Sequence, residues 1–147
     1  MAVDSRAKGQ RGEYLVRDLL RKHTGLKWER VPASGALSYL KGDLYVPHEV
    51  NNYLIEVKNY EEQAVDLKLL TNKSCNLIKW WTKAIEQAAE REQEPLLFFK
   101  HARSKVFVAT KDEPKKCPKY MYINYLDVYV TLAEDWLKKE EIFWLGE

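Results

Sequence analysis

The sequence has 147 residues, of which 46% are hydrophobic and 31% are charged, with a formal net charge of +2. These values are typical of one folded domain with a sizeable core, which we expect to span residues 1–147. No apolar run is long enough to cross a bilayer, and the basic residues 1–11 lack the apolar core of a secretion signal. Cys75 and Cys117 lie far apart without partners at metal-ligand spacing, so we expect a cytoplasmic protein without disulfides or a zinc site.

The small net charge hides an uneven distribution along the chain. Residues 1–41 hold nine Lys or Arg against four acidic residues, whereas residues 42–58 hold three acidic residues and one lysine. A basic region beside an acidic one suits a polyanionic substrate that is drawn to a metal site. The alternative is that the basic residues form a solvated helix face.

The first predicted helix runs from about residue 6 or 8 to residue 23, and Gly25 supplies its left-handed cap. Its core stripe consists of Val16, Leu19 and Leu20. Glu13 falls on this same stripe, near the helix N-terminus. An acid there is either favoured by the helix dipole or placed on the buried face for a function.

Three strands are predicted next, over residues 27–31, 42–46 and 53–58. A loop over residues 32–38 separates the first two strands, and a turn over residues 47–52 joins the last two. The last two strands therefore form a hairpin.

The predicted hairpin carries the residues that point most directly to chemistry. Alternation along the second strand puts Glu56 and Lys58 on one face, close to Asp43 at the start of the first strand. Glu-x-Lys alone arises about once in every two chains of this length by chance. The apolar residues around this motif and the neighbouring Asp43 favour a functional site over a chance match. Burying charged groups costs several kcal/mol each unless they pair or bind an ion. We therefore predict a site for a hard divalent metal.

The sequence pattern in the second half of the chain predicts two helices and two or three strands. A helix over residues 76–93, stopped by Pro95, has an apolar stripe with Trp80 at its edge. The stripe consists of Leu77, Trp81, Ala84, Ile85 and Ala88. Strands follow over residues 96–99 and 106–109, with a short edge strand over 120–125, and a capping box at Thr131–Glu134 opens a last helix to about Glu141. The order α-β-β-β-α-β-β-α predicts an α/β fold with a mixed central sheet flanked by helices.

This order, together with Glu13, Asp43 and Glu56-Val57-Lys58, resembles the PD-(D/E)XK nuclease superfamily and its restriction-endonuclease-like core. Over roughly the first 60 residues the chain is similar to the archaeal and phage Holliday-junction resolvases. The motifs that carry this similarity are Lys8-Gly9 before Glu13, Arg30-Val31-Pro32-Ala33-Ser34-Gly35, Gly42-Asp43 and Ile55-Glu56-Val57-Lys58. Gly42 stands where the superfamily name expects proline.

The resemblance implies a Mg²⁺-dependent endodeoxyribonuclease, with Mn²⁺ as a substitute, that makes paired symmetric nicks at four-way DNA junctions and leaves 5′-phosphates. The implied metal ligands are Glu13, Asp43, Glu56 and the backbone carbonyl of Val57. Lys58 would orient the attacking water and stabilise charge on the phosphorane oxygens. Ser34 is either a residue of a loop over the scissile phosphate or a turn serine. Lys8, Arg11 and Arg30 would hold flanking phosphates, although each is equally compatible with a surface charge.

A resolvase is expected to act as a homodimer, because a junction carries two equivalent strands to be cut. Trp80, Trp81, Trp136 and Trp144 are expected in the core or at a subunit interface, with the second helix or the C-terminal segment as the contact. A phage origin would place the protein in the host cytoplasm. The alternatives are a restriction-like or recombination-associated nuclease on linear DNA, a non-cleaving DNA-binding module of the same fold, and an unrelated α/β protein.

Overall fold

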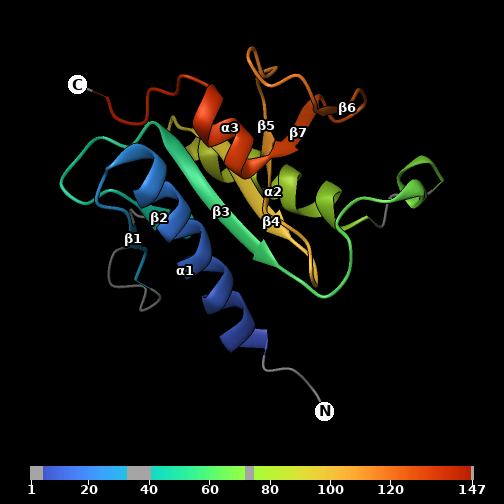
Figure 1. The fold of residues 1–147 in the computed structure, drawn as a ribbon, viewed down its shortest axis with the longest axis horizontal. Coiled ribbons are helices and arrows are strands. Elements are labelled where there is room, and N and C mark those ends of the chain that lie inside the picture. The colour runs from blue at the N-terminus through green and yellow to red at the C-terminus, as the bar shows by residue number, and fades with distance from the viewer. Residues whose placement is uncertain (1–4, 33–40, 72–74, 147) are drawn as a thin grey trace.

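The computed structural model describes residues 5–32, 41–71 and 75–146, which form one seven-stranded sheet with helices on both faces (Figure 1). The strand order in the sheet is β1-β2-β3-β4-β5-β7-β6. The elements are α1 (Ser5–Thr24), β1 (Glu29–Arg30), β2 (Leu44–Tyr45), β3 (Tyr53–Asn59), the 3₁₀ turn η1 (Leu67–Leu70), α2 (Asn76–Glu90), β4 (Glu94–Lys100), β5 (Phe107–Thr110), β6 (Met121–Ile123), β7 (Val128–Leu132) and α3 (Ala133–Lys139). The predicted α/β class with a mixed, helix-flanked sheet is confirmed.

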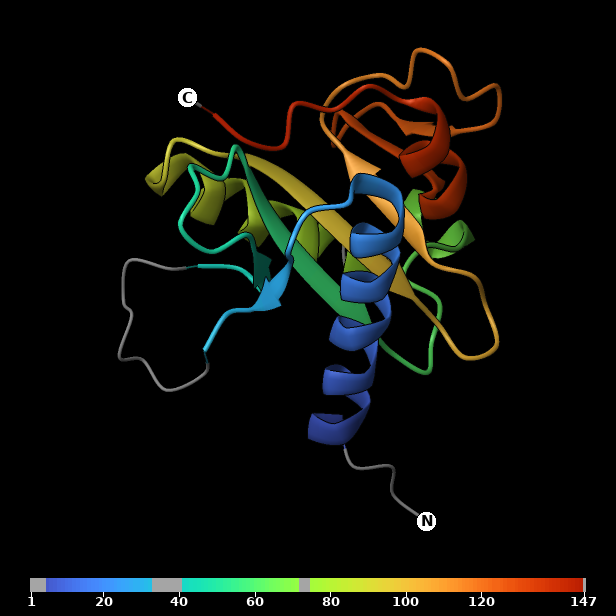
Figure 2. The same ribbon diagram turned by 60° about the vertical axis from the view of Figure 1, so that its left-hand side comes forward.

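The two faces of the sheet are covered by different helices. Helices α1 and α3 lie on one face and α2 lies on the other, which the turned view shows clearly (Figure 2). Each face has its own core, because side chains alternate along the strands. Ile55 and Val57 of β3 pack on the α1 side, whereas Leu97 and Phe99 of β4 pack on the α2 side.

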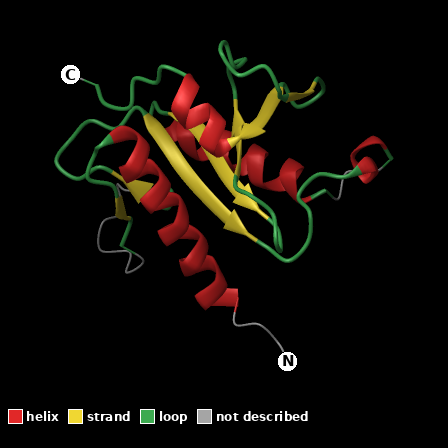
Figure 3. Cartoon of the chain, in the orientation of Figure 1, coloured by secondary structure: helices red, strands yellow, loops and turns green. Residues whose placement is uncertain are grey.

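Strand β3 lies near the middle of the sheet and connects its two halves. It pairs antiparallel with β2, as the predicted hairpin requires, and parallel with β4 (Figure 3). Helix α2 lies between β3 and β4 in the chain, as a parallel pair requires a crossover connection. The remaining strand pairs are antiparallel.

Helix α1 follows its prediction closely and approaches β3 through a glycine. Val16 and Leu20 are buried, and Gly25 adopts a φ of 72° while its N–H donates to the Arg21 carbonyl at 3.0 Å. Gly12 is also buried, because a Cβ there would lie 2.7 Å from the Cβ of Asn59. Glycine inside a helix costs about 0.5–1 kcal/mol relative to alanine, so this close contact explains its presence.

We expect Gly12→Ala to destabilise the protein by about 1–3 kcal/mol, since overpacking at the contact with Asn59 must push α1 away from β3. Gly9→Ala is the matched control, because no atom outside its own helix lies within 4 Å of the new methyl group. That variant should be as stable as the wild type or slightly more stable. Urea denaturation compares the two, and equal stability of both variants would show that α1 is not held at Gly12.

The end of the sheet differs from prediction in two places. Strand β7 was not predicted, and the capping box proposed at Thr131 is wrong. Thr131 belongs to β7, pairs with Val108 of β5 and is buried, while Leu132 precedes α3 without a side-chain cap. Pairing with β5 therefore prevails over local helix capping. The predicted edge strand is confirmed as β6, which pairs only with β7.

Helix α2 also departs from its predicted bounds. It ends at Glu90, and Pro95 lies inside β4 instead of directly ending the helix. Ile85, placed on the predicted stripe, is 41% exposed, so that part of the prediction is wrong. The helix packs through a narrower stripe of Leu77, Trp81, Ala84 and Ala88. Helix α3 ends at Lys139, two residues before the predicted end.

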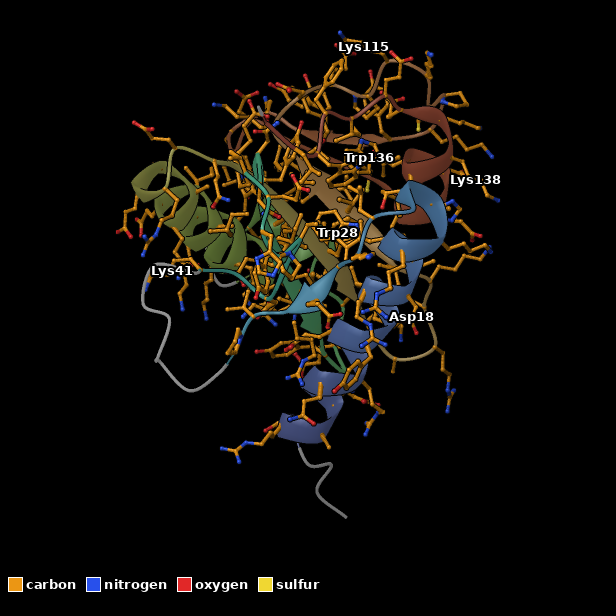
Figure 4. All side chains as sticks on the ribbon, turned by 90° about the vertical axis from the view of Figure 1, so that its left-hand side faces the viewer. Asp18, Trp28, Lys41, Lys115, Trp136 and Lys138 are labelled. Atoms are coloured by element: carbon orange, nitrogen blue, oxygen red, sulfur yellow. The ribbon has the colours of Figure 1, made fainter. Side chains whose placement is uncertain are left out.

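Most of the tryptophans belong to the core of this single chain. Trp28, Trp81 and Trp136 are buried, and Figure 4 shows Trp28 and Trp136 toward the middle of the molecule. Trp144 packs edge-to-face against Trp28 and Trp136, with ring centroids 5.3 and 5.9 Å apart. The C-terminal segment is tied to the hairpin turn, since Gly146 donates to the Val50 carbonyl at 2.8 Å. The tryptophan count therefore no longer argues for a subunit interface.

Among the described residues, no helix combines the length and the apolar character needed to span a membrane.

Candidate active site

A pocket of about 420 Å³ opens where β3 ends beside the N-terminal half of α1. It brings together segments from α1, the start of β2 and the end of β3. Its lining residues are Ser5, Lys8, Gly9, Glu13, Asp43, Val57, Lys58, Asn59, Tyr60 and Glu61. Five of the predicted site residues, Lys8, Glu13, Asp43, Val57 and Lys58, thus meet at one pocket, whereas Glu56 is not among its lining residues.

Asp43 is held rigidly against the backbone of β3. Its N–H donates to the Ile55 carbonyl at 2.7 Å, and its Oδ2 accepts from the Val57 N–H at 2.7 Å. Gly42 precedes it with a φ of 83°, and a Cβ there would lie 2.9 Å from the Ile55 oxygen. Proline, whose φ is locked near −65°, cannot adopt this conformation. Glycine in place of the expected proline is therefore required by the close approach of β2 to β3.

The backbone of Val57 also faces this site. In a β-strand the N–H and C=O of one residue point to the same side of the strand. Because the Val57 N–H donates to Asp43, its carbonyl oxygen is directed toward the same edge. Strand β2 pairs with β3 only at Leu44 and Ile55, so β2 does not cover this part of the edge.

Asp43 and Glu56 form a close pair of carboxyl groups. The pKa of Glu56 is raised from 4.5 to about 8, mainly by burial and further by the charge of Asp43 and a hydrogen bond between the two carboxyls. The positive charges of Lys58 and Lys83 oppose this shift only in part. At neutral pH the pair therefore holds one proton in the absence of a cation.

This shift gives the metal-free protein a defined dependence of stability on pH. Between the ordinary pKa of 4.5 and the folded-state pKa of about 8, folded Glu56 keeps a proton that the unfolded chain has lost. The stabilisation is complete below the lower pKa and is lost as the pH rises through the upper one. We expect the free energy of unfolding to fall between about pH 5 and pH 8, by up to about 1.4 kcal/mol per unit.

Urea denaturation in EDTA at several pH values measures this decline. Glu56→Gln, which cannot titrate, is the control and should show a flatter profile than the wild type. Mg²⁺ should oppose the decline, since a bound cation displaces the proton. Parallel profiles for wild type and Glu56→Gln would contradict the assignment of the shifted pKa to Glu56.

Lys58 lies on the same side of β3 as Glu56, as the alternation predicts. Lys58 is among the residues that line the pocket, together with Asp43 and Glu13. The lysine is half-buried near the end of the strand, where pairing with β4 holds its backbone. A fixed positive charge at this position suits an oxyanion that develops during a reaction.

Glu13 occupies the opposite wall of the pocket and is paired with a cation. Its Oε1 accepts from Arg30 Nε at 2.9 Å, and the side chains of Glu13 and Arg30 are only 19% and 27% exposed. The same guanidinium lies over the ring of Tyr14, 5.0 Å from its centroid. Hydrogen bonding to Glu13 raises the pKa of Arg30, so the guanidinium stays charged. Arg30 is therefore held in place by Glu13, which lines the pocket, although Arg30 is not itself a lining residue.

The other predicted contact residues differ in their surroundings. Lys8 lines the pocket and forms an ion pair with Glu61, whose carboxyl pKa is lowered mainly by that hydrogen bond. Arg11 is exposed on α1. Ser34 lies outside the described residues.

The donor atoms present are compatible with a hard divalent cation. Within residues 5–32, 41–71 and 75–146, no three His, Cys, Asp or Glu side chains converge on one metal position. Mg²⁺, however, is commonly held by one or two carboxylates, with waters and substrate phosphates completing its shell. The Asp43–Glu56 pair provides such carboxylates, and its shared proton marks where a cation would relieve the repulsion. The Val57 carbonyl adds a further hard oxygen on the same edge.

Comparison with known proteins assigns this architecture to a family. The family described as "Phage putative PDDEXK endonuclease" matches residues 4–144 of this chain. The chain belongs to the phage PD-(D/E)XK endonuclease family. This family match confirms the resemblance to the PD-(D/E)XK superfamily and extends it over nearly the whole chain.

Two individual proteins are similar to this member of the PD-(D/E)XK family. Protein D14 of Escherichia phage T5 is 38% identical over 150 residues, covering 93% of this chain and 94% of that protein. The solved structure of Hjc, a Holliday junction resolvase from Archaeoglobus fulgidus, aligns with 16% identity and a TM-score of 0.46, covering 90% of this chain and 95% of that one.

The structure adds contacts around this PD-(D/E)XK site that sequence reasoning missed. Asn59 donates from Nδ2 to the Lys8 carbonyl at 3.0 Å and so ties α1 to the end of β3. Gly12 was the available signal, because a glycine inside a helix often marks a close approach. Tyr60, two residues beyond Lys58, also lines the pocket. No local pattern distinguished it from the other tyrosines.

Proposed function

We propose that this protein is a Mg²⁺-dependent DNA endonuclease that resolves four-way junctions by paired nicks, acting as a homodimer in the cytoplasm of a phage-infected host. The observation that carries the nuclease chemistry is the half-buried Asp43–Glu56 carboxyl pair beside Lys58 toward the end of β3. Membership of a phage endonuclease family supports the same reaction class.

Asp43 and Glu56 would hold the metal, with the Val57 carbonyl as a third oxygen donor. Such an ion would polarise the scissile phosphate and lower the pKa of the attacking water. Lys58 orients that water and stabilises the charge that builds on the phosphorane oxygens. Cleavage then yields a 5′-phosphate and a 3′-hydroxyl.

Glu13 acts from the opposite wall of the pocket. It would support the metal directly or through a water molecule, while its Oε1 accepts from Arg30. The guanidinium of Arg30, together with Lys8 and Arg11, contacts phosphates that flank the cut and positions the backbone without reading bases. Ser34 lies outside the described residues, and its contact with the scissile phosphate stays a prediction.

Junction selectivity is supported by the resolvase-like motifs of the first 60 residues. A two-fold dimer presents two equivalent sites to the two strands of a junction, whereas this chain supplies material for one site. The dimer is thus part of the same proposal and is tested with it.

Incubation with Mg²⁺ and equimolar four-way junction, linear duplex and single strand tests the proposal. We expect paired symmetric nicks confined to the junction, and a dimer by light scattering with or without junction DNA. Equal cutting of linear duplex would favour the restriction-like alternative. A monomer both with and without junction DNA would remove most of the support for resolution of four-way junctions. Junction binding without cleavage in Mg²⁺ or Mn²⁺ would indicate a DNA-binding module.

A further inference from the structure

An aromatic residue stands at the edge of the catalytic pocket. Tyr60 follows β3 directly, and continued alternation places it on the same side as Glu56 and Lys58. It lines the pocket with Lys58, and 44% of the residue is exposed. A large ring at this position is therefore available to a ligand that reaches the pocket.

Tyr60 is held both at its backbone and at its ring. Its backbone N–H donates to the Lys100 carbonyl at the end of β4, at 3.1 Å. Its ring contacts Trp80 of α2, with centroids 4.8 Å apart and planes inclined by 47°. Trp80 in turn packs against the core on the α2 face. Binding at Tyr60 thus costs little side-chain entropy, because the ring is held before a ligand arrives.

We propose that Tyr60, supported by Trp80, is a stacking platform for an unpaired nucleobase next to the cleaved phosphate. The inference rests on the proposed function in that DNA is the substrate. Every base has an apolar face that stacks on an aromatic ring, so such a platform binds single-stranded DNA with little sequence preference.

The position of the ring determines which base it holds. Residues two apart along an extended strand are separated by about 6.7 Å, which is the spacing of Lys58 and Tyr60 along the chain. The stacked base therefore belongs to a nucleotide adjacent to the phosphate that Lys58 contacts. In an intact duplex that base is stacked between its neighbours and cannot meet the ring without being extruded. Tyr60 would consequently favour DNA whose bases are unpaired at a branch or an end.

The test measures binding without cleavage, in an Asp43→Asn background. Variants Tyr60→Ala and Tyr60→Phe are compared on a forked DNA, a linear duplex, a 20-nucleotide oligothymidylate and the same oligonucleotide carrying abasic sites. Tyr122→Ala is the matched control, since Tyr122 is 48% exposed and also stacks on a neighbouring ring, that of Tyr129, away from the pocket. Fluorescence anisotropy gives the dissociation constants, and circular dichroism confirms that each variant is folded.

We expect Tyr60→Ala to weaken binding to fork and single strand by about five- to hundredfold, the range expected when one stacked base is lost. Tyr60→Phe and Tyr122→Ala should bind as the parent does. Duplex binding should be unchanged, and abasic sites should abolish the difference between the parent protein and the Tyr60→Ala variant. Equal losses of affinity on all four DNAs, or no loss of affinity for the fork, would overturn the inference. Tyr60 would then serve only to pack against Trp80.

The outcome also separates this inference from the proposed function. A Tyr60-dependent, base-dependent effect on the oligothymidylate supports stacking even if the protein shows no preference for forks or junctions. In that case only the junction proposal fails. Absence of binding to every DNA would overturn both.

Discussion

Asp43→Asn and Glu56→Gln should each abolish cleavage of the four-way junction while leaving junction binding intact or tighter. Each substitution removes a carboxylate that we propose as a metal ligand. In Mg²⁺, where the cation displaces the proton of the pair, each also removes a negative charge that repels phosphate. The amide introduced by Asp43→Asn keeps an oxygen that can accept from the Val57 N–H, so the 2.7 Å contact that fixes β2 on β3 survives. The loss should therefore concern chemistry and not folding.

Single-turnover cleavage and gel-shift binding, measured on the same preparations, check this result. Glu62→Gln is the matched control, because Glu62 is exposed shortly after β3 and does not line the pocket. It should cut at the wild-type rate. If binding and cutting fall together for Asp43→Asn and Glu56→Gln, the two acids build the fold instead of the site.

The carboxyl pair also predicts how these variants differ from each other. Asp43 raises the pKa of Glu56 through its charge and through the hydrogen bond between them. Asp43→Asn removes that charge, so it should lower the pKa of Glu56, whereas Glu56→Gln removes the titration altogether.

Lys58→Ala should slow cleavage by about 10²–10³-fold, the usual loss when one preorganised charge is removed from a developing oxyanion. Metal affinity should barely fall, because an ammonium group is not a metal ligand. The rate loss should therefore persist at saturating Mg²⁺. Single-turnover rates across a Mg²⁺ titration separate these two quantities.

Lys83→Ala is the sharpest control for this experiment. Lys83 and Lys58 both lower the pKa of Glu56 through their charge, but Lys83 comes from α2 and does not line the pocket. If Lys58 acts on the reacting phosphate, Lys83→Ala should reduce the cleavage rate much less than Lys58→Ala does. Similar losses for both variants would mean that Lys58 acts only through Glu56, and near-normal turnover of Lys58→Ala would remove it from the mechanism.

Local pattern in the sequence was sufficient for the elements that carry the site. The period of two along Tyr53–Asn59 predicts that Glu56 and Lys58 share a side, and the period of 3.6 predicts α1 with its Val16 and Leu20 stripe. The hairpin that brings Asp43 to β3 follows from a short turn between two apolar runs. Such inferences succeed because backbone geometry alone sets which neighbouring side chains point the same way.

Tertiary structure decided which distant groups meet. Thr131 fits a capping box by its local sequence, yet pairing with Val108 of β5 makes it part of β7. Glu13 is paired with Arg30 from β1, and the ring of Tyr60 rests on Trp80 of α2. These partners come from separate elements, and their proximity depends on the order of strands in the sheet and on which face each helix covers. Periodicity determines the direction of a side chain, whereas the long-range packing of the folded chain determines what that side chain contacts.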